Sequence, residues 1–584
     1  MTLTDYLLRA PAAIRARNKT LVLTLLFLGS VLALLPGIGK ITGVTTKDEY
    51  FLIYGTALTM AERHEWLVPH LDGAPRIRKP PLISWLARAS FELLGVSVSS
   101  GRLVGVFFAA LFVVVVALIG FECTRDLNYG VSAALIALST GGLAVQGRFL
   151  MLDIPTAALS GLGFYWFLRW CKSQRPLWMV AAAASLACGF LTKGPAVGVL
   201  FGSGVIALVL TSAETRSKIQ QKRGVLCVSF LLFLGLSLPW FASVYWLYPE
   251  YSLVDFQKEL EERQIGQLTL QPLLAAGAIF FPWTFLLIPS FSPAQTTPAG
   301  DSSWRQTRAF LMLWCGFSLA PFLFLKFSER YILGSLMPIA LLTATAFLKG
   351  TEEVRIYSRW GIVVTSFVVF SAAVFSWWFK TAFVELIGVV VAYVIFVGIW
   401  WHSRGILPMA VSATMLWTAL VGFLYPTFGA NAIPSSVVER VKGERVFLYR
   451  EPQPAFLAVT LGRSLERVVR IELRHLQSGN ERCPWIFVTE HDRPSLEQEL
   501  RALGVDPKPV HSYKTLGQVE HVIRSALKPE TWNHWIVAFR TRSPEPIMQS
   551  IFLYRLGGSG ACQTTSTTPK ESGFQPSDFE HGQA

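Results

Sequence analysis

Thirteen long apolar runs constrain the fold of this chain more than any other feature of its sequence. A helix needs about 17–25 mostly apolar residues to cross the hydrocarbon core of a membrane. Runs of that length lie near 20–40, 101–121, 130–147, 154–170, 177–192, 195–211, 225–247, 271–290, 309–326, 331–348, 360–378, 382–401 and 406–427. The first run shows no small-residue cleavage site, so we expect it to be a retained span. The sequence predicts an all-α polytopic membrane protein with about 13 transmembrane helices.

The charge balance supports a membrane protein and argues against a nucleic-acid partner. Charged residues make up 15% of the chain, whereas soluble domains average about 25%. The net charge is +14, but no basic stripe has the geometry of a groove reader. Loop lysines and arginines are instead typical of topology signals and of contacts with anionic lipid head groups.

Basic clusters in the short loops predict the orientation, because cytoplasmic loops carry an excess of Lys and Arg. With thirteen spans, every such cluster falls on the side of the N-terminus. The clusters are Arg9–Lys19, Arg169–Arg175, Arg216–Arg223, Arg305–Arg308 and Lys349–Arg359. The sequence therefore predicts a cytoplasmic N-terminus, a membrane part over 1–430, and a C-terminal region on the outer side.

The C-terminal region has a different pattern, of short apolar strands and amphipathic helices, which is typical of a small α/β domain. The segments are 446–450, 468–473, 485–490, 495–504, 535–541 and 550–556. We expect this extracytoplasmic domain over 431–557 and a disordered tail over 558–584, which is polar and nearly without apolar residues. A disulfide between Cys483 and Cys562 stays open as an alternative to two free thiols.

The first outer loop, 41–100, is longer than a hairpin needs, and we expect it to carry two amphipathic helices along the membrane interface. Arg76, Arg78 and Lys79 cluster within it, against the positive-inside tendency. One interpretation is an anion site, with Lys79 as a point charge and the arginines as forks for a phosphate. The alternative is a solvated or lipid-facing cluster.

Further ionisable residues lie on the same predicted outer face. Asp48 follows the first span and Asp153 lies in the second outer turn, where ionisable groups at membrane depth are usually functional. Each aspartate has helix capping as its alternative role. Lys193 also lies on this face, and its alternative role is snorkelling to the interface. A second group on this face comprises Lys326, Glu329, Arg330 and Tyr331. A third loop, whose alternative is a solvated helix, contains Glu259, Glu261, Glu262 and Arg263.

Two acids and several cations on one membrane face fit the displacement of a phosphate-linked sugar. One carboxylate takes the proton of an acceptor hydroxyl, and the cations stabilise the departing phosphate. The sugar already carries its leaving group, and the sequence accordingly contains no Walker A motif.

The residues in these loops resemble a known family. The segment 46–86, with TKDEY, WLVPH and KPP, is similar to the outer loop of the bacterial lipid A aminoarabinose transferases, GT-C enzymes related to protein O-mannosyltransferases. Four further blocks resemble the family in order: FLTKGP (190–195), 238–266, FFPWTFLLIP (280–289) and SERYILGSLMPIALL (328–342). The resemblance implies a GT-C fold and a location in the bacterial inner membrane with a periplasmic active site.

The same resemblance implies roles for individual residues. It makes Asp48 the catalytic carboxylate and Asp153 the second functional acid, with Lys79, Lys193 and Arg330 as contacts of the donor phosphate. Glu49, Arg76, Arg78, Arg263 and Tyr331 complete the expected substrate-binding set. The donor is then a sugar on undecaprenyl phosphate, and the anomeric centre inverts.

Two positions depart from the family pattern. The acid that often precedes the motif lysine is Arg78 here, and the histidine expected in the third loop is Leu260. Because Arg cannot bind a divalent cation as a carboxylate does, we expect no metal and no other cofactor. The departures also weaken the case for aminoarabinose as the sugar.

Three other functions remain as alternatives. A protein O-mannosyltransferase-like enzyme shares the fold and the acids and differs only in its acceptor. A lipid or polysaccharide transporter would tend to have internal repeats and broken midplane helices, and neither is visible in the sequence. A non-catalytic scaffold is disfavoured because Asp48, Asp153 and Lys79 are all present. The expected partners are the prenyl-phosphate sugar, a lipid A, glycan or protein acceptor, and membrane lipids.

Overall fold

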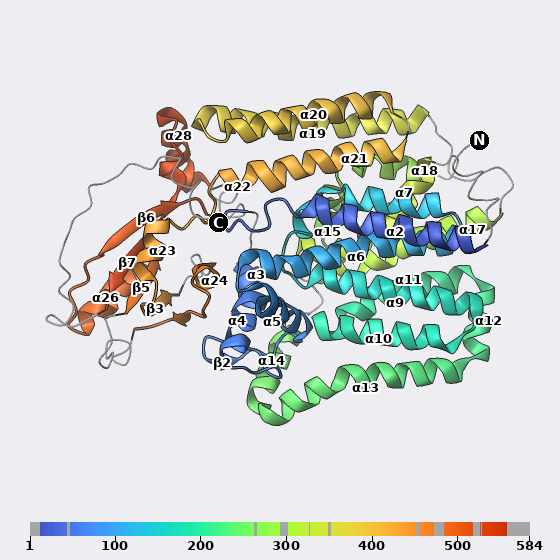
Figure 1. Ribbon diagram of the computed structural model, residues 1–584, viewed down its shortest axis with the longest axis horizontal. Coiled ribbons are helices and arrows are strands. Elements are labelled where there is room, and N and C mark those ends of the chain that lie inside the picture. The colour runs from blue at the N-terminus through green and yellow to red at the C-terminus, as the bar shows by residue number, and fades with distance from the viewer. Residues whose placement is uncertain are drawn as a thin grey trace.

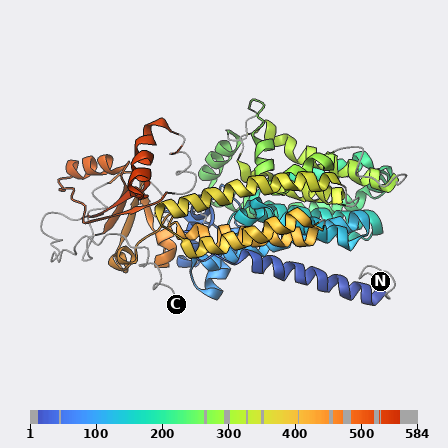
Figure 2. The same cartoon turned by 90° about the horizontal axis from the view of Figure 1, so that it is seen from above.

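The protein is described from a computed structural model, which consists of a long bundle of helices with a small sheet at one end (Figure 1, Figure 2). The structure describes residues 12–43, 47–261, 266–291, 302–325, 328–347, 352–403, 405–450, 456–471, 484–517, 526 and 528–556. The predicted tail over 558–584 and both Cys483 and Cys562 lie outside these residues.

Each of the thirteen predicted apolar runs holds a helix in the part of the chain that the structure describes. These helices are α2 (Ala12–Leu34), α6 (Val98–Thr124), α7 (Leu127–Leu138), α9 (Asp153–Ser173), α10 (Pro176–Lys193), α11 (Ala196–Thr211), α13 (Arg223–Leu247), α15 (Gln271–Phe280), α17 (Ser302–Leu319), α18 (Leu336–Ala346), α19 (Glu352–Phe379), α20 (Phe383–His402) and α21 (Ile406–Trp417). Shorter helices join them: α8 (Gly141–Gln146), α12 (Ala213–Gln221), α14 (Pro249–Glu261), α16 (Leu287–Phe291) and α22 (Tyr425–Thr427).

The structure does not confirm the predicted number of thirteen membrane spans. Among the described residues, six helices are long and apolar enough to cross a membrane, or eight if each of two bent helix pairs counts as one span. Several of the remaining helices are short, such as α7 and α18, and α15 ends at Phe280, where the chain bends sharply. The coarser prediction, a helical protein with several apolar membrane helices, is confirmed.

Helix α6 is the centre of the bundle. Of its most apolar window, 67% is buried, against 17% for α13 at the periphery. Ser97 begins α6 with a capping box, because its hydroxyl accepts from the Ser100 N–H while the Ser100 hydroxyl accepts from the Ser97 N–H. Helices α2, α7 and α9 pack around α6, which places its first turns beside the outer loop.

The first outer loop forms a compact layer over one end of the bundle. It contains α3 (Lys47–Glu49), a π-helical segment η1 (Tyr50–Tyr54), α4 (Gly55–Glu62) and α5 (Leu82–Leu94). Between α4 and α5, strands β1 (His70–Leu71) and β2 (Ala74–Pro75) pair as an antiparallel hairpin. The two amphipathic helices expected here correspond to α4 and α5, and the turn of the hairpin contains Asp72 and Gly73, both at positive φ.

The C-terminal part contains a mixed five-stranded sheet, in the order β4-β3-β5-β7-β6. The strands are β3 (Val446–Tyr449), β4 (Glu466–Val468), β5 (Trp485–Thr489), β6 (His511–Thr515) and β7 (Gln549–Arg555), with helices α23 (Ser435–Val441), α24 (Leu457–Leu461), α26 (Arg493–Ala502) and α28 (Trp532–Thr541). Strands β3 and β5 are buried at every position, so their apolar runs do not alternate. The segment 535–541 is helical and belongs to α28.

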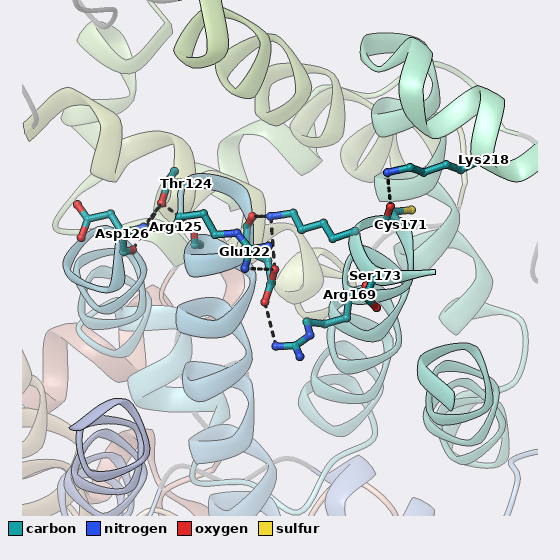
Figure 3. A network of polar contacts seen from close by, with 10 residues as sticks. Glu122, Thr124, Arg125, Asp126, Arg169, Cys171, Ser173 and Lys218 are labelled. Atoms are coloured by element: carbon teal, nitrogen blue, oxygen red, sulfur yellow. Dashed lines mark hydrogen bonds and ion pairs between the residues drawn. The ribbon is translucent and has the colours of Figure 1, made fainter. Parts of the chain in front are cut away.

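Polar contacts join several helices at the end of α6 opposite the outer loop (Figure 3). The carboxylate of Glu122, which is fully buried, pairs with Arg125 at 3.1 Å and with Arg169 and Lys172 of α9 at 3.4 Å each. Lys218 of α12 donates to the Cys171 carbonyl at 2.7 Å. Residues of two predicted basic clusters, Arg169–Arg175 and Arg216–Arg223, thus lie at one end of the bundle, and the outer loop lies at the other end.

Candidate active site

A single guanidinium joins the two aspartates that the sequence singles out. Arg330 lies in the 3-10 helix η4 (Glu329–Ser335), which precedes α18. Its Nη2 donates to Asp48 Oδ2 at 2.6 Å, and its Nε lies 3.7 Å from Asp153 Oδ2. Asp48 and Asp153 are 105 positions apart in the sequence, yet both contact the same guanidinium, one through Nη2 and the other through Nε. The structure thus brings both predicted acids and Arg330 together in one cluster.

Lys193 completes the cluster from the neighbouring helix, because its ammonium group donates to Asp153 Oδ1. Helices α9 and α10 form a hairpin that turns at Gln174 and Arg175, so the start of α9 and the end of α10 meet at its open end. The N-terminus of a helix favours a carboxylate and the C-terminus favours a cation. Asp153 and Lys193 therefore occupy the helix ends that stabilise their charges.

These contacts replace the capping and snorkelling alternatives. Leu152 is the N-cap residue of α9, and Asp153 caps no backbone N–H, because both of its oxygens face cations. Lys193 turns back to Asp153 instead of extending along the bundle surface, and its ammonium also lies 4.2 Å from the centre of the Tyr331 ring. The Tyr331 ring thus forms an aromatic wall beside both cations, with Arg330 at 5.9 Å.

The two carboxylates differ in access to solvent. The Asp48 side chain is 38% exposed, whereas the Asp153 side chain is 5% exposed. Burial alone lowers the pKa of a guanidinium, but the Asp153 and Asp48 carboxylates outweigh it and hold the pKa of Arg330 above its usual value. The cluster therefore contains a permanently charged arginine, a buried acid and an acid that a substrate can reach.

Glu49 has a different environment from the one expected of a substrate ligand. It is fully buried, and Arg102 of α6 donates to both of its oxygens, at 2.8 and 2.9 Å. The Leu150 N–H also donates to Glu49, at 2.9 Å. Both carboxylate oxygens are thus occupied by protein groups. In this arrangement Glu49 ties α3 to α6 and to the segment before Asp153, and it does not face a substrate.

Arg102 is a buried residue that supports the site through Glu49 and that the sequence reasoning missed. Its remaining donors reach the carbonyls of Ile38 and Lys40, both at 3.1 Å, so it also fixes the end of the first apolar run. The available signal was an arginine one turn inside an apolar run, a placement that is rare without a partner. Arg148, which is buried and donates to the carbonyls of Ala33 and Pro36, was missed in the same way.

Two glycines of α6 let the backbone segments that carry the aspartates come close. A Cβ at Gly105 would lie 2.0 Å from the Phe149 carbonyl oxygen, and a Cβ at Gly101 would lie 2.5 Å from the Tyr54 ring. Phe149 is four residues before Asp153, and Tyr54 is six residues after Asp48. Helix α6 therefore supports both halves of the cluster.

The basic cluster of the outer loop lies at the exit of the hairpin. Arg76 Nε donates to the Phe51 carbonyl at 3.0 Å, and the Arg76 N–H donates to Pro69 at 2.7 Å, so this side chain is held against η1. Arg78 and Lys79 follow it and are partly exposed. Their role as phosphate ligands stays a prediction. Arg263 and Lys326 lie outside the described residues.

A metal at this site also stays untested. Within the ranges that the structure describes, no three side chains of His, Cys, Asp or Glu are grouped as metal ligands would be. Of the two departures from the family pattern, Arg78 is a cation, and Leu260 brings no nitrogen or oxygen ligand in its side chain.

Comparisons with known proteins concern the fold and the family resemblance of the chain. Residues 46–254 match the family model "Dolichyl-phosphate-mannose-protein mannosyltransferase". A crystal structure of ArnT from Cupriavidus metallidurans, bound to undecaprenyl phosphate, covers 86% of this chain and is itself covered to 97%, with a TM-score of 0.64 and 14% identity. The chain has the ArnT fold. The likeness at this identity concerns the fold alone.

Curated relatives confirm the family resemblance. An undecaprenyl phosphate-alpha-4-amino-4-deoxy-L-arabinose arabinosyl transferase of Pseudomonas fluorescens is 26% identical over 311 residues, which cover 50% of each protein. A protein of the same name from Pectobacterium atrosepticum is 28% identical over 353 residues, 58% of this chain and 60% of the relative. The chain thus spans about half of the curated relatives' length.

Proposed function

We propose that this chain is an inverting glycosyltransferase of the inner membrane. In this proposal it transfers a sugar from undecaprenyl phosphate to a hydroxyl or phosphate of lipid A or another envelope glycan. The observation that carries the proposal is the cluster of Asp48, Asp153, Lys193 and Arg330, which joins an accessible acid to two cations in one contiguous ion-pair network. The resemblance to the arabinosyl transferases supports the choice of a prenyl-phosphate donor.

In the proposed reaction, Asp48 takes the proton of the acceptor hydroxyl, because it is the more exposed acid. The acceptor oxygen forms a bond to the anomeric carbon while the bond from that carbon to the phosphate oxygen breaks. The electron pair leaves with the prenyl phosphate, whose charge Lys193, Arg330 and Lys79 stabilise. One displacement inverts the anomeric centre, and no cofactor is required.

Asp153 and Glu49 have supporting roles in this proposal. Asp153 orients Lys193 and Arg330, since its buried carboxylate contacts both of them. Glu49 holds the short helix α3, and thereby Asp48, against α6 through Arg102. An arriving phosphate would compete with Asp48 for Arg330, which would free the Asp48 carboxylate to accept a proton.

We place the site on the periplasmic side, with the N-terminus in the cytoplasm and the C-terminal sheet in the periplasm. The contacts support this, because Arg125, Arg169 and Lys172 pair with Glu122, and Lys218 lies on α12, at the opposite end of the bundle from α3 (Figure 1). An excess of such residues is typical of the cytoplasmic side. A prenyl donor would then present its sugar on the periplasmic side of the membrane.

The match to the mannosyltransferase family model favours a second candidate, in which the acceptor is a protein hydroxyl. The chemistry at Asp48 would be the same, because a serine or threonine hydroxyl also loses its proton to a carboxylate. The cluster does not distinguish a lipid A acceptor from a protein acceptor, so the experiment below is designed to distinguish them.

The deciding experiment is mass spectrometry of lipid A and of prenyl-phosphate lipids from cells that carry the wild-type gene, no gene, or the Asp48→Asn variant. We expect a sugar-sized mass on lipid A with the wild type alone, and the matching prenyl-phosphate sugar to accumulate in the other two. Asp126→Asn is the matched control, since Asp126 is an N-cap residue at the far end of the bundle and Asn caps equally well.

Two further outcomes separate the candidates. If lipid A is the same in all cells and the prenyl-phosphate sugar still accumulates without the active gene, the acceptor is a protein or another glycan. A fully active Asp48→Asn enzyme would remove Asp48 as the base. In the same assay, Lys79→Ala should lower donor use far more than Lys222→Ala, because Lys222 is exposed on the α12–α13 turn away from the cluster.

A further inference from the structure

Helix α28 of the C-terminal part has more apolar surface than the sheet covers. Of its ten residues only Ala538 is fully buried. Trp532, Ile536 and Phe539 are 53%, 46% and 44% exposed, and they share one face because they are spaced i, i+4 and i+7. An amphipathic helix of a globular domain normally turns its apolar stripe toward a core. This stripe is instead left open.

The open stripe lies where two candidate membrane spans begin and end. The Trp378 indole donates to the Phe539 carbonyl at 2.9 Å, and the Phe379 and Phe539 rings are 5.7 Å apart. Both contacts join α28 to the last turn of α19, next to the start of α20 (Figure 1). Because α19 is apolar enough to cross a membrane, we expect its last turn near the edge of the hydrocarbon core.

The neighbouring side chains on α19 and α20 are exposed and apolar at the same height. Trp377 is 60% exposed, and Val384 and Ile387 in the first turns of α20 are 79% and 65% exposed. Surfaces of this kind on membrane helices face lipid, and aromatic residues gather at the interface. The stripe of α28 is continuous with this surface through Phe539, which touches both Trp378 and Phe379.

The charges around α28 match a surface of anionic head groups. Residues 528–542 contain Lys528, Arg540 and Arg542 against one acid, Glu530, and all four are exposed. The Arg542 guanidinium lies 4.9 Å from the centre of the Trp378 ring, at the end of the span. Basic side chains flanking an apolar face are typical of helices that lie in the interface plane.

We propose that α28 is an interfacial helix, which inserts Trp532, Ile536 and Phe539 into the head-group region of the bilayer. The occupant of the stripe is therefore a lipid surface containing anionic phospholipid. This contact would hold the C-terminal sheet at a fixed height above the membrane, independently of the reaction that the chain catalyses.

The test uses the full chain in bilayer nanodiscs that contain phosphatidylglycerol with a diazirine on the upper acyl chain. After illumination, proteolysis and mass spectrometry locate the carbene adducts. We expect adducts on the peptide that carries Trp532–Phe539, at about five times or more the level on α26. Helix α26 is the control, because it lies on the same sheet and has none of the large exposed apolar residues.

Variants then separate the stripe from the rest of the helix. Trp532→Ser with Ile536→Ser should reduce the adducts on α28 to the level on α26, whereas Asn533→Ser with Thr541→Ser, on the polar side, should leave them unchanged. A thermal unfolding curve shows whether each variant is folded. Wild-type labelling of α28 no higher than α26 would overturn the proposal, and so would a stripe that crosslinks to a second copy of the chain instead of to lipid.

Discussion

Arg330 illustrates how one side chain can define a site. It contacts a carboxylate on α3 through Nη2 and another on α9 through Nε, so one planar guanidinium serves both. Asp48 and Glu49 show that two adjacent residues can face different partners. Neighbouring residues on a helix point about 100° apart, so Asp48 faces Arg330 while Glu49 faces Arg102 inside the bundle. The sequence could not separate their roles, because they are adjacent in one motif.

Arg330→Lys should retain a positive charge and lose the simultaneous contacts with Asp48 and Asp153. An ammonium group is a compact point charge and lacks the separate Nε and Nη2 donors of the guanidinium. We expect kcat/KM for sugar transfer to fall by about a hundredfold, which corresponds to about 2.7 kcal/mol. Steady-state kinetics with purified enzyme would measure it. Arg216→Lys, on α12 far from the cluster, is the control, and equal kinetics of both variants would contradict the bridging role.

At the scale of elements, helix existence was predictable and helix function was less so. Thirteen apolar runs predict helices because length and hydropathy identify them, but the short α7 and the sharp bend after α15 are set by packing. The segment 535–541 is apolar and short, and periodicity alone does not assign such a run to a strand or a helix. The support that α6 gives the site depends on Gly101 and Gly105, whose close contacts come from segments distant in sequence.

Gly105→Ala should displace the segment that leads to Asp153, since the new Cβ would lie 2.0 Å from the Phe149 carbonyl oxygen. Overpacking of this kind costs about 1–3 kcal/mol of stability, and we expect transfer activity to fall as well. Thermal unfolding and activity assays on one preparation would measure both. Gly198→Ala is the matched control in α11, where a Cβ meets nothing within 4 Å; a loss of stability there equal to that of Gly105→Ala would contradict the argument.

The hairpin of the outer loop should weaken in acid because of His70. Burial, and next Arg63, lower the pKa of His70, while Glu65 opposes them. A lowered pKa means that the folded protein prefers the neutral ring, so this contribution is present above the unfolded pKa of about 6.5 and is lost as the pH falls through the folded value. Melting temperatures at pH 7.5 and pH 5 would test this. His70→Gln should reduce the difference between them, and an unchanged difference would exclude His70 as the cause.

At the scale of the whole molecule, the outer loop connects the membrane bundle to the C-terminal sheet. Glu62 accepts a hydrogen bond from the Ser464 N–H at 2.5 Å, and Asp72 lies 3.6 Å from Arg467. Phe456 packs its ring against Tyr54 at 5.6 Å and Tyr50 at 6.3 Å. The layer that carries Asp48 is thus held from both sides, an arrangement that the sequence pattern did not reveal because its contacts span about 400 residues.

Phe456→Ala should therefore affect both the sheet and the site. Phe456 is buried, and loss of a buried phenylalanine ring costs about 3–5 kcal/mol. We expect a lower melting temperature and reduced transfer, because Tyr50 and Tyr54 lie two and six residues after Asp48. Phe367→Ala, at a position on α19 that is 71% exposed, is the control. Normal activity of a destabilised Phe456→Ala enzyme would show that the sheet does not support the site.

The distance along the chain between Asp48 and Arg330 also sets the order of events during synthesis. The ribosome produces Asp48, Asp153 and Lys193 long before Arg330, and the intervening helices enter the membrane in that order. A nascent chain that ends before Ser328 therefore holds both acids and one lysine without the arginine that joins them. The two acids are synthesised early, but the cluster is complete only after Arg330 has been synthesised. An incompletely inserted chain therefore has no assembled site that could act on the donor lipid.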